Sequence, residues 1–195
     1  GVQTCALPIY RPLRIIVPLV VGGPGDIHAR ALAHRLTETM GQNVIVENRP
    51  GAGSNIGFEA AAKASPDGYT VLLAPTPFTI NPFLFSKVPY DPARDFVAVT
   101  RVAAFPLMLV VHPSVPVSGA KEFIEYARAR PGQLNFGSSG NGSSLHLAGE
   151  LMNTMAGIRL VHVPYKGAPE ALNDAIAGRI GVGFPGTPIA IAHVK

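Results

Sequence analysis

The feature that most constrains this chain is a glycine-rich stretch, VVGGPGD at residues 20–26, which separates an apolar run from a helical pattern. The run LRIIV at 13–17 is typical of a buried strand, and the spacing of apolar residues predicts a helix over 27–40 that Gly41 ends. Where a strand passes through a short loop into a helix, the first helical amides lack intrahelical partners and lie at the positive end of the helix dipole. The stretch therefore predicts a small anion-binding site.

The first half of the chain continues this alternation of strand and helix. Further strands are predicted at 44–46 and 69–74, and a second glycine-rich turn at 49–55 leads into a short helix through Ala64. The proline-rich stretch 75–92 is predicted to be a loop. The order strand, helix, strand, helix, strand indicates a parallel sheet flanked by helices.

A second, similar unit follows, and it carries its own loop of small residues, GSSGNGSS at 137–144. The elements predicted beyond the proline-rich loop are strands at 96–103, 107–112, 134–136, 159–163 and 179–184, and helices at 118–130, 145–156 and 168–177. Open α/β sheets bind ligands at the carboxyl ends of their strands, so the two glycine-rich loops form opposite sides of one cleft if the sheets face each other. We therefore predict an α/β protein with two lobes, each a mainly parallel sheet flanked by helices, that closes on an anionic ligand.

The predicted boundary between the lobes follows from this repeat. The first lobe is expected over residues 10–101 and the second over 102–195, with residues 1–9 a tail or a sequence scar. Those first residues lack the pattern of a secretory signal, but a mature secreted chain lacks it as well, so it does not identify the compartment.

Composition excludes several classes of protein. The 195 residues are 47% hydrophobic, which is enough for one sizeable core or two small ones. The 16 basic and 12 acidic residues are scattered, so we expect no nucleic-acid partner. No apolar stretch reaches the roughly 18 residues of a membrane span, and the single Cys5 cannot form an internal disulfide. The six histidines show no metal-ligand spacing, so no metal and no cofactor is expected.

Asp26 complicates the anion site that the first loop predicts. In the simplest interpretation the loop is a tight turn and Asp26 is the N-cap of the helix. With a ligand present, three arrangements stay open: Asp26 caps the helix while loop amides bind the ligand, water bridges the two, or Asp26 receives the ammonium group of an amino-acid ligand.

Two enzymatic interpretations were weighed. Gly23 and Gly25 match the first two glycines of a dinucleotide-binding fingerprint, but His28 stands where the third is needed for close packing of helix on strand. Ser143 and His146 are close enough in sequence to form a nucleophile and base, yet the strained elbow of a hydrolase is missing. Hydroxyls that bind a ligand are favoured, and an α/β transferase or esterase acting on an anionic substrate stays the alternative.

Several ordered motifs from about Arg11 to the chain end carry a resemblance to a known family. They are GGPGDIHAR, VIVENRPGAGSNIG, SPDGYTVLL, INPFLF, PGQLNFGSSGNGSSLHLAGE and VHVPYKGAPEAL. With them the chain resembles the Bug family, the periplasmic solute-binding receptors of tripartite tricarboxylate transporters. The resemblance implies a non-enzymatic, two-lobed Venus flytrap of the type II periplasmic-binding-protein class. Its ligand would be a di- or tricarboxylate, an acidic amino acid or an aromatic acid, delivered to the membrane permease subunits of the transporter. We expect such a receptor to be a monomer.

The resemblance also assigns ligand-binding residues in both lobes, and no catalytic residue or metal ligand. The first-lobe residues are Gly22, Gly23, Pro24, Asp26, Thr76 and Thr79, and the second-lobe residues are Ser139, Gly140, Gly142, Ser143 and Ser144.

The chain departs from the family pattern in three places. Leu19-Val20-Val21 replaces the usual Phe-Pro-Pro before the glycines, which removes a ring-fixed backbone. Phe184-Pro185 stands where an aspartate commonly follows Met-Phe, so a ligand contact there is lost or relocated. Family members also continue past the final IAHVK, so we expect a C-terminally truncated member with an incomplete first lobe, which on its own binds ligand weakly or not at all.

Overall fold

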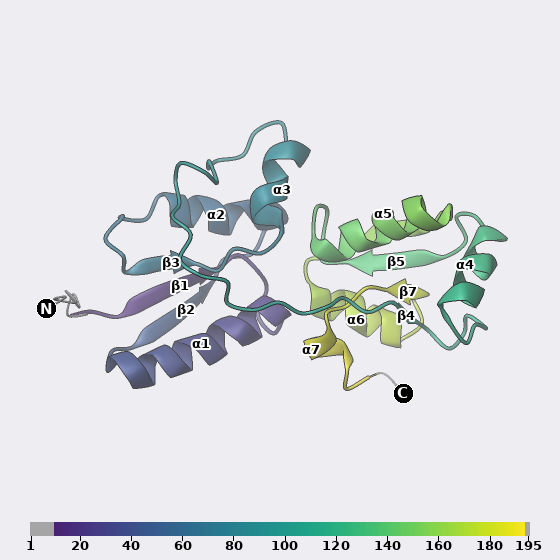
Figure 1. The fold of residues 1–195 in the computed structure, drawn as a ribbon, viewed down its shortest axis with the longest axis horizontal. Coiled ribbons are helices and arrows are strands. Elements are labelled where there is room, and N and C mark those ends of the chain that lie inside the picture. The colour runs from purple at the N-terminus through teal and green to yellow at the C-terminus, as the bar shows by residue number, and fades with distance from the viewer. Residues whose placement is uncertain (1–9, 194–195) are drawn as a thin grey trace, which may run out of the picture.

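The structure, a computed structural model, describes residues 10–193. The predicted tail at 1–9 therefore lies outside the described residues. Figure 1 shows two α/β units side by side, joined by a long extended segment of chain, and each unit has a sheet of its own.

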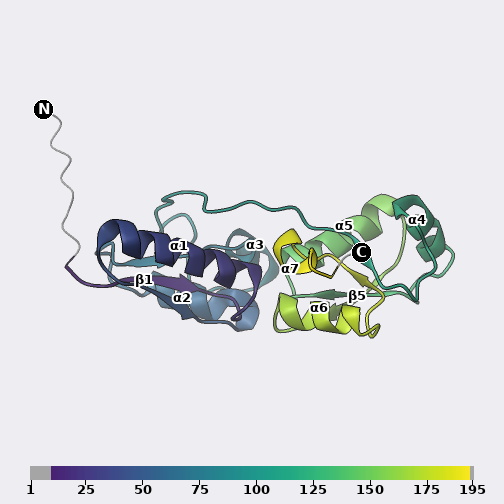
Figure 2. The same ribbon diagram turned by 90° about the horizontal axis from the view of Figure 1, so that it is seen from below.

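The first unit is a parallel sheet with the strand order β2-β1-β3. Its elements are β1 (Leu13–Val17), α1 (Pro24–Met40), β2 (Val44–Asn48), the 3-10 turn η1 (Ala52–Ser54), α2 (Asn55–Ala62), β3 (Thr70–Leu72) and α3 (Pro77–Leu84). Central strand β1 pairs on both sides, with Ile15 opposite Val46 and Val71. The apolar run predicted as a buried strand is therefore buried, because α1 and α2 cover opposite faces of the sheet (Figure 2).

The second unit is a mixed sheet with the strand order β4-β7-β5-β6, in which only the β4–β7 pairing is antiparallel. Its elements are β4 (Val110–Val111), α4 (Ala120–Arg128), β5 (Asn135–Ser138), α5 (Ser144–Ala156), β6 (Val161–Pro164), α6 (Ala168–Ile176), β7 (Val182–Gly183) and α7 (Thr187–Ala190). A core built around Phe123, Phe136 and Val182 lies between the sheet and its helices. Helices α5 and α6 lie on opposite faces of this sheet (Figure 2).

The glycines at the helix ends do what their positions predict. Gly41 ends α1 with φ 66°, and Gly157 ends α5 with φ 59°. Both angles are in the left-handed region, where a residue without Cβ is favoured.

Helix α3 corrects the prediction of a loop over 75–92. Pro77 is tolerated because it occupies the first turn, where an amide has no intrahelical partner. Pro82 lies farther inside and cannot donate to the carbonyl of Phe78, four residues earlier. The hydroxyl of Tyr90 donates to that carbonyl instead, over 2.8 Å, which lets the helix continue past its proline.

The predicted strand at 96–103 is wrong. These residues run from the first unit toward the second without regular secondary structure (Figure 1). Val97 and Val99 are 91% and 85% exposed, so the alternation that favours a strand here is not matched by a buried face.

Candidate functional site

The carboxyl ends of the parallel strands in each unit point toward the other unit. Figure 1 shows the arrow of β1 directed at the second unit and the arrow of β5 directed at the first. Helices α1 and α3 begin at this edge of the first sheet, and α5 and α6 begin at the facing edge of the second. The structure therefore brings the two predicted loops to one seam between the units.

Contacts across the seam come from glycines that leave no room for a side chain. A Cβ added at Gly142, in the loop before α5, would lie 2.7 Å from Cδ1 of Leu84 in α3. A Cβ added at Gly167, before α6, would overlap the side chain of Val20, in the loop before α1. The seam is therefore packed backbone against side chain at these two points.

Asp26 organises the first loop. Helix α1 begins at Pro24, with Gly23 as its N-cap, three residues earlier than predicted. Asp26 is therefore in the first turn and is not the N-cap, which corrects that assignment. Its carboxylate is 2% exposed and accepts hydrogen bonds from the Gly22 amide at 2.9 Å, from Nε of Arg30 at 3.0 Å and from Nδ2 of Asn48 at 2.9 Å.

These bonds keep Asp26 charged. Burial alone would raise the pKa of Asp26, but the hydrogen bond from Arg30, joined by those from Gly22 and Asn48, lowers it overall. The carboxylate therefore holds the shape of the loop, and the Gly22 amide already has the carboxylate as its acceptor.

Other amides at this edge have no intrahelical partner. The first intrahelical bond of α1 runs from Ile27 to Gly23, which leaves the amides of Gly25 and Asp26 at the head of the helix. Thr76 and Thr79 are exposed at the start of α3, where the hydroxyl of Thr79 donates to the carbonyl of Thr76. This edge therefore presents both amides and hydroxyls.

The second loop is held by internal hydrogen bonds. Ser143 caps α5, accepting from the backbone amide of His146 at 3.3 Å. The Gly142 amide donates to Nδ1 of the His146 ring at 3.2 Å, and the Gly140 amide donates to the hydroxyl of Ser138 at 3.1 Å.

The imidazole of His146 therefore binds the loop backbone, and Ser143 serves as a helix cap, which is not the arrangement of a nucleophile and its base. Helix α5 donates its first intrahelical bond from Leu147 to Ser143, so the amides of Ser144 and Leu145 stay without intrahelical partners. Ser139 lies just before these residues, half-buried.

The pairing of His146 with His162, which the sequence did not predict, supports this loop. His162, on β6, lies with Nε2 only 2.6 Å from the hydroxyl of buried Ser138, and its ring centroid is 4.1 Å from that of His146. Desolvation, followed by repulsion from His146, lowers the pKa of His162, and the charge of Glu150 acts in the opposite direction. The lowered pKa favours the neutral form of His162 in the cluster of Ser138, His146 and His162.

The turn before α2 lies where the sequence predicts a glycine-rich turn, but its run of positive φ values and its contact with Asn81 were not predicted. Gly51, Ala52, Gly53 and Ser54 have φ values of 122°, 48°, 63° and 76° in succession. Positive φ at Ala52 and Ser54 is unfavourable and needs support from the surroundings. Asn81 of α3 supplies some of it, since its Nδ2 donates to the carbonyl of Gly53 and to Oδ1 of Asn55, each at 2.8 Å. Two sequence motifs mark this feature: GAGSN at residues 51–55, which forms the turn, and INPFLF at residues 80–85, which contains Asn81.

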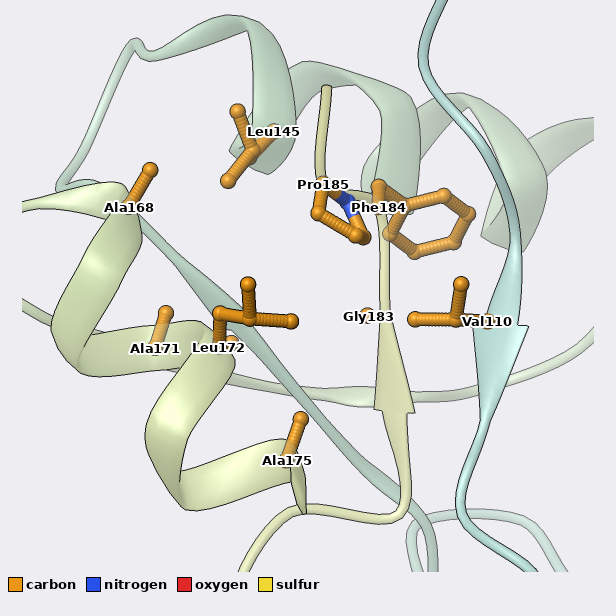
Figure 3. Close-up of a pocket in the computed structure, with 10 residues that line it drawn as sticks. Val110, Leu145, Ala168, Ala171, Leu172, Ala175, Gly183, Phe184 and Pro185 are labelled. Carbon is orange, nitrogen blue, oxygen red and sulfur yellow. The ribbon is translucent and has the colours of Figure 1, made fainter. Parts of the chain in front are cut away.

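A cavity inside the second unit is not a ligand site. It has a volume of about 10 Å³, room for at most one water molecule. Apolar side chains such as Leu145, Leu172 and Phe184 surround it (Figure 3). Within residues 10–193, no group of three or more His, Cys, Asp or Glu side chains is placed to hold a metal ion.

Two α/β units with facing loops, joined by one described segment of chain, form the architecture of a two-lobed binding protein. Comparison with known proteins identifies the family. Residues 28–195 match the sequence model described as the tripartite tricarboxylate transporter family receptor. The chain therefore belongs to this family, as the motifs predicted, and the predicted fold class is confirmed.

Individual relatives agree with the family assignment. The chain is 36% identical over 187 residues to the protein BugT of Bordetella pertussis, covering 95% of this chain and 57% of BugT. The solved structure of R. palustris Rpa4515 with adipate superposes with a TM-score of 0.89 at 37% identity, covering 93% and 61% of the two chains. MatC (Rpa3494) from Rhodopseudomonas palustris with bound malate gives a TM-score of 0.83 at 27% identity, covering 94% and 63%.

These comparisons decide between receptor and enzyme. Members of the family are solute-binding receptors that catalyse no reaction, so the alternative of a transferase or an esterase is excluded. The family is periplasmic. Over the described residues, none of the helices has the length and apolar character needed to cross a bilayer. The chain spans about half the length of the curated relatives it matches.

Proposed function

We propose that this chain binds a small carboxylate between its two lobes and delivers it to the permease subunits of a tripartite tricarboxylate transporter, as a periplasmic monomer. The observation that carries the proposal is the position of the loops before α1 and α5 on the facing edges of the two units, each at the head of a helix. We place the lobes at residues 10–101 and 102–195. The ligand class is a di- or tricarboxylate, an acidic amino acid or an aromatic acid.

The chemistry of the seam suits an anion. The helix-start amides of Gly25 and Asp26 in one lobe, and of Ser144 and Leu145 in the other, lie at the positive ends of helix dipoles. Hydroxyls of Thr76 and Ser139 add donors that can turn toward a carboxylate oxygen. A ligand held from both sides stabilises the closed arrangement of the lobes, because only that arrangement offers both sets of donors.

The backbone of each loop is shaped before ligand arrives. Of the residues assigned from the resemblance, Gly22, Gly140 and Gly142 use their amides for internal hydrogen bonds, and Asp26 and Ser143 use their side chains in the same way. We propose that these residues position the loops, and that Gly23, Pro24 and Ser144 border the ligand directly. Pro24 has no amide hydrogen, so its contribution is to fix the backbone and to contact apolar parts of the ligand.

Calorimetric titration of the native protein with a panel of carboxylic acids tests the proposal. We expect saturable binding of at least one unmodified acid, with a rise in the unfolding temperature that follows ligand concentration. The corresponding methyl esters, which lack the charge, should bind weakly or not at all. Absence of stabilisation by every acid, or equal binding of acid and ester, would contradict the proposal.

A further inference from the structure

We propose that Asn81 and the left-handed turn at residues 51–55 form a polar subsite that recognises a hydrogen-bond donor on the ligand, such as a hydroxyl or an ammonium group. This inference rests on the proposed function and narrows it, since the preferred ligand becomes a carboxylate that also carries a donor. The subsite belongs to the first lobe and faces the loop before α5.

The hydrogen bonds of Asn81 define its orientation. Its side chain is completely buried, and both bonds donated by Nδ2 end on acceptors, the carbonyl of Gly53 and Oδ1 of Asn55. Two acceptors facing one end of the amide require that end to be the NH₂ group. The opposite end is therefore the oxygen Oδ1.

That oxygen has an unused hydrogen-bonding capacity. Among the side-chain atoms of residues 10–193, Oδ1 of Asn81 is buried and has no hydrogen-bond partner. A buried acceptor left unsatisfied costs about 1–3 kcal/mol. An arrangement that keeps such an oxygen at the seam is therefore explained most simply by a donor that arrives with the ligand.

The oxygen faces the other lobe. A Cβ built on Gly142 would lie 3.4 Å from Oδ1 of Asn81, so the second-lobe loop approaches the oxygen with a residue that has no side chain. The Gly142 amide does not satisfy it, because that amide donates to His146. A donor that binds between the lobes would approach Oδ1 beside the Gly142 backbone, where no side chain covers the oxygen.

The turn provides a rigid base for this oxygen. Four successive residues with positive φ are held in place through the two bonds that Asn81 donates. Strained backbone of this kind is found at ligand-binding positions more often than elsewhere. The turn and the side chain therefore support each other, and the acceptor is pre-oriented before ligand binds.

Pairs of acids that differ by one donor test the subsite in the unaltered native protein. Suitable probes are succinate against malate and aspartate, glutarate against 2-hydroxyglutarate, and benzoate against 2-hydroxybenzoate, each titrated by calorimetry. In the pair that binds most tightly, we expect the acid with the donor to bind at least about tenfold more tightly, because only that acid satisfies Oδ1. Equal affinity within the pair would overturn the subsite and leave the proposed function intact. No binding by any acid would overturn both.

Two substitutions assign the preference to Asn81. Asn81→Leu keeps the approximate shape and removes the acceptor, so affinity for the donor-bearing acid should fall more than affinity for its partner. Since this variant also loses the bonds to the turn, a second variant, Gly142→Ala, keeps Asn81 and places a methyl group beside Oδ1.

Gly157→Ala is the matched control for the second variant. Gly157 has a similar left-handed φ of 59° and open space around an added Cβ, and it lies at the far end of α5. Gly142→Ala should reduce the preference for the donor, and Gly157→Ala should leave it unchanged. A preference that survives both Asn81→Leu and Gly142→Ala would show that the donor is recognised elsewhere.

Discussion

The two predicted ligand loops have the same position in their lobes but are built with different chemistry. In the first lobe a charged carboxylate, Asp26, accepts the Gly22 amide and is balanced by Arg30. In the second lobe the Ser138 hydroxyl accepts a hydrogen bond from the Gly140 amide, and the His146 ring accepts one from the Gly142 amide. Each loop is therefore shaped by side chains that bind glycine amides, but only in the first is the acceptor a carboxylate paired with an arginine.

Because of this difference, we expect the two loops to respond differently to mutation and to pH. Removing a buried carboxylate that accepts from three donors should lower the free energy of unfolding substantially, because all three donors lose that acceptor. A network of hydroxyl and imidazole groups contains weaker neutral bonds but responds to protonation near neutral pH. The first loop should therefore be sensitive to mutation, and the second to acid.

The largest effect is expected from Asp26→Ala. This change leaves the Gly22 amide and the Asn48 amide group without their acceptor at a part-buried site, so the free energy of unfolding should fall by about 3 kcal/mol. Chemical denaturation measures the change. Arg30→Ala is the control: because that side chain is half exposed, loss of its ion pair should lower the free energy of unfolding less than Asp26→Ala does. Equal losses in the two variants would mean that the salt bridge, and not the amide bonds, stabilises the loop.

Gly23→Val should weaken ligand binding by at least about tenfold. Gly23 is an N-cap with extended φ and only one atom near an added Cβ, Val20 O at 3.5 Å, so a side chain is accommodated without backbone strain but enters the ligand space. Titration with the tightest-binding acid measures the loss. Gly119 caps α4 in a similar extended conformation with open space around it, so Gly119→Val should bind normally. Unchanged affinity in Gly23→Val would show that the first loop does not border the ligand.

Ser138→Ala should lower the free energy of unfolding by about 1–2 kcal/mol. The change removes a completely buried hydroxyl that holds the Gly140 amide and contacts His162. The loss should be smaller than that of Asp26→Ala, because the bonds involved are between neutral groups. A loss equal to or larger than that of Asp26→Ala would break the proposed contrast between the loops.

Mild acid should affect the second loop, with the smallest effect of the four. Because the pKa of His162 is lowered in the folded protein, stability is complete above the ordinary pKa of about 6.5 and falls as pH drops from there to the lowered value. Asp26 behaves differently: its lowered pKa keeps its contribution complete down to about pH 4. The free energy of unfolding should therefore fall between pH 7.5 and pH 5 in the unaltered protein. It should fall less over the same range in His162→Gln. Identical pH profiles would contradict the role of the histidine pair.

Local sequence patterns predicted most of the first unit and helices α4, α5 and α6 of the second, but not α7. The helical spacing from Ala29 to Met40 and the stop at Gly41 describe α1 well, because one face of that helix packs on the sheet. Helix α3 was missed because Pro77 and Pro82 are helix breakers when considered locally. Only the fold shows that a distant hydroxyl, that of Tyr90, accommodates Pro82.

The sequence predicted which loops form the candidate site, but it did not predict which residues hydrogen-bond to those loops. Glycines and serines before α1 and α5 mark where a ligand can approach, and the structure places both at the seam. The partners of those loops come from elsewhere in the chain: Asn48 from β2, His162 from β6 and Asn81 from α3. Spacing along the sequence contains no signal for such pairings, since tertiary packing alone brings them together.

A crystal structure of the native protein with its tightest-binding acid tests the central claim most directly. We expect one carboxylate of the bound acid to lie between the lobes, within hydrogen-bond distance of donors from both residues 22–26 and residues 139–145. A bound acid that contacts only one of these loops, or that lies away from the seam, would contradict it.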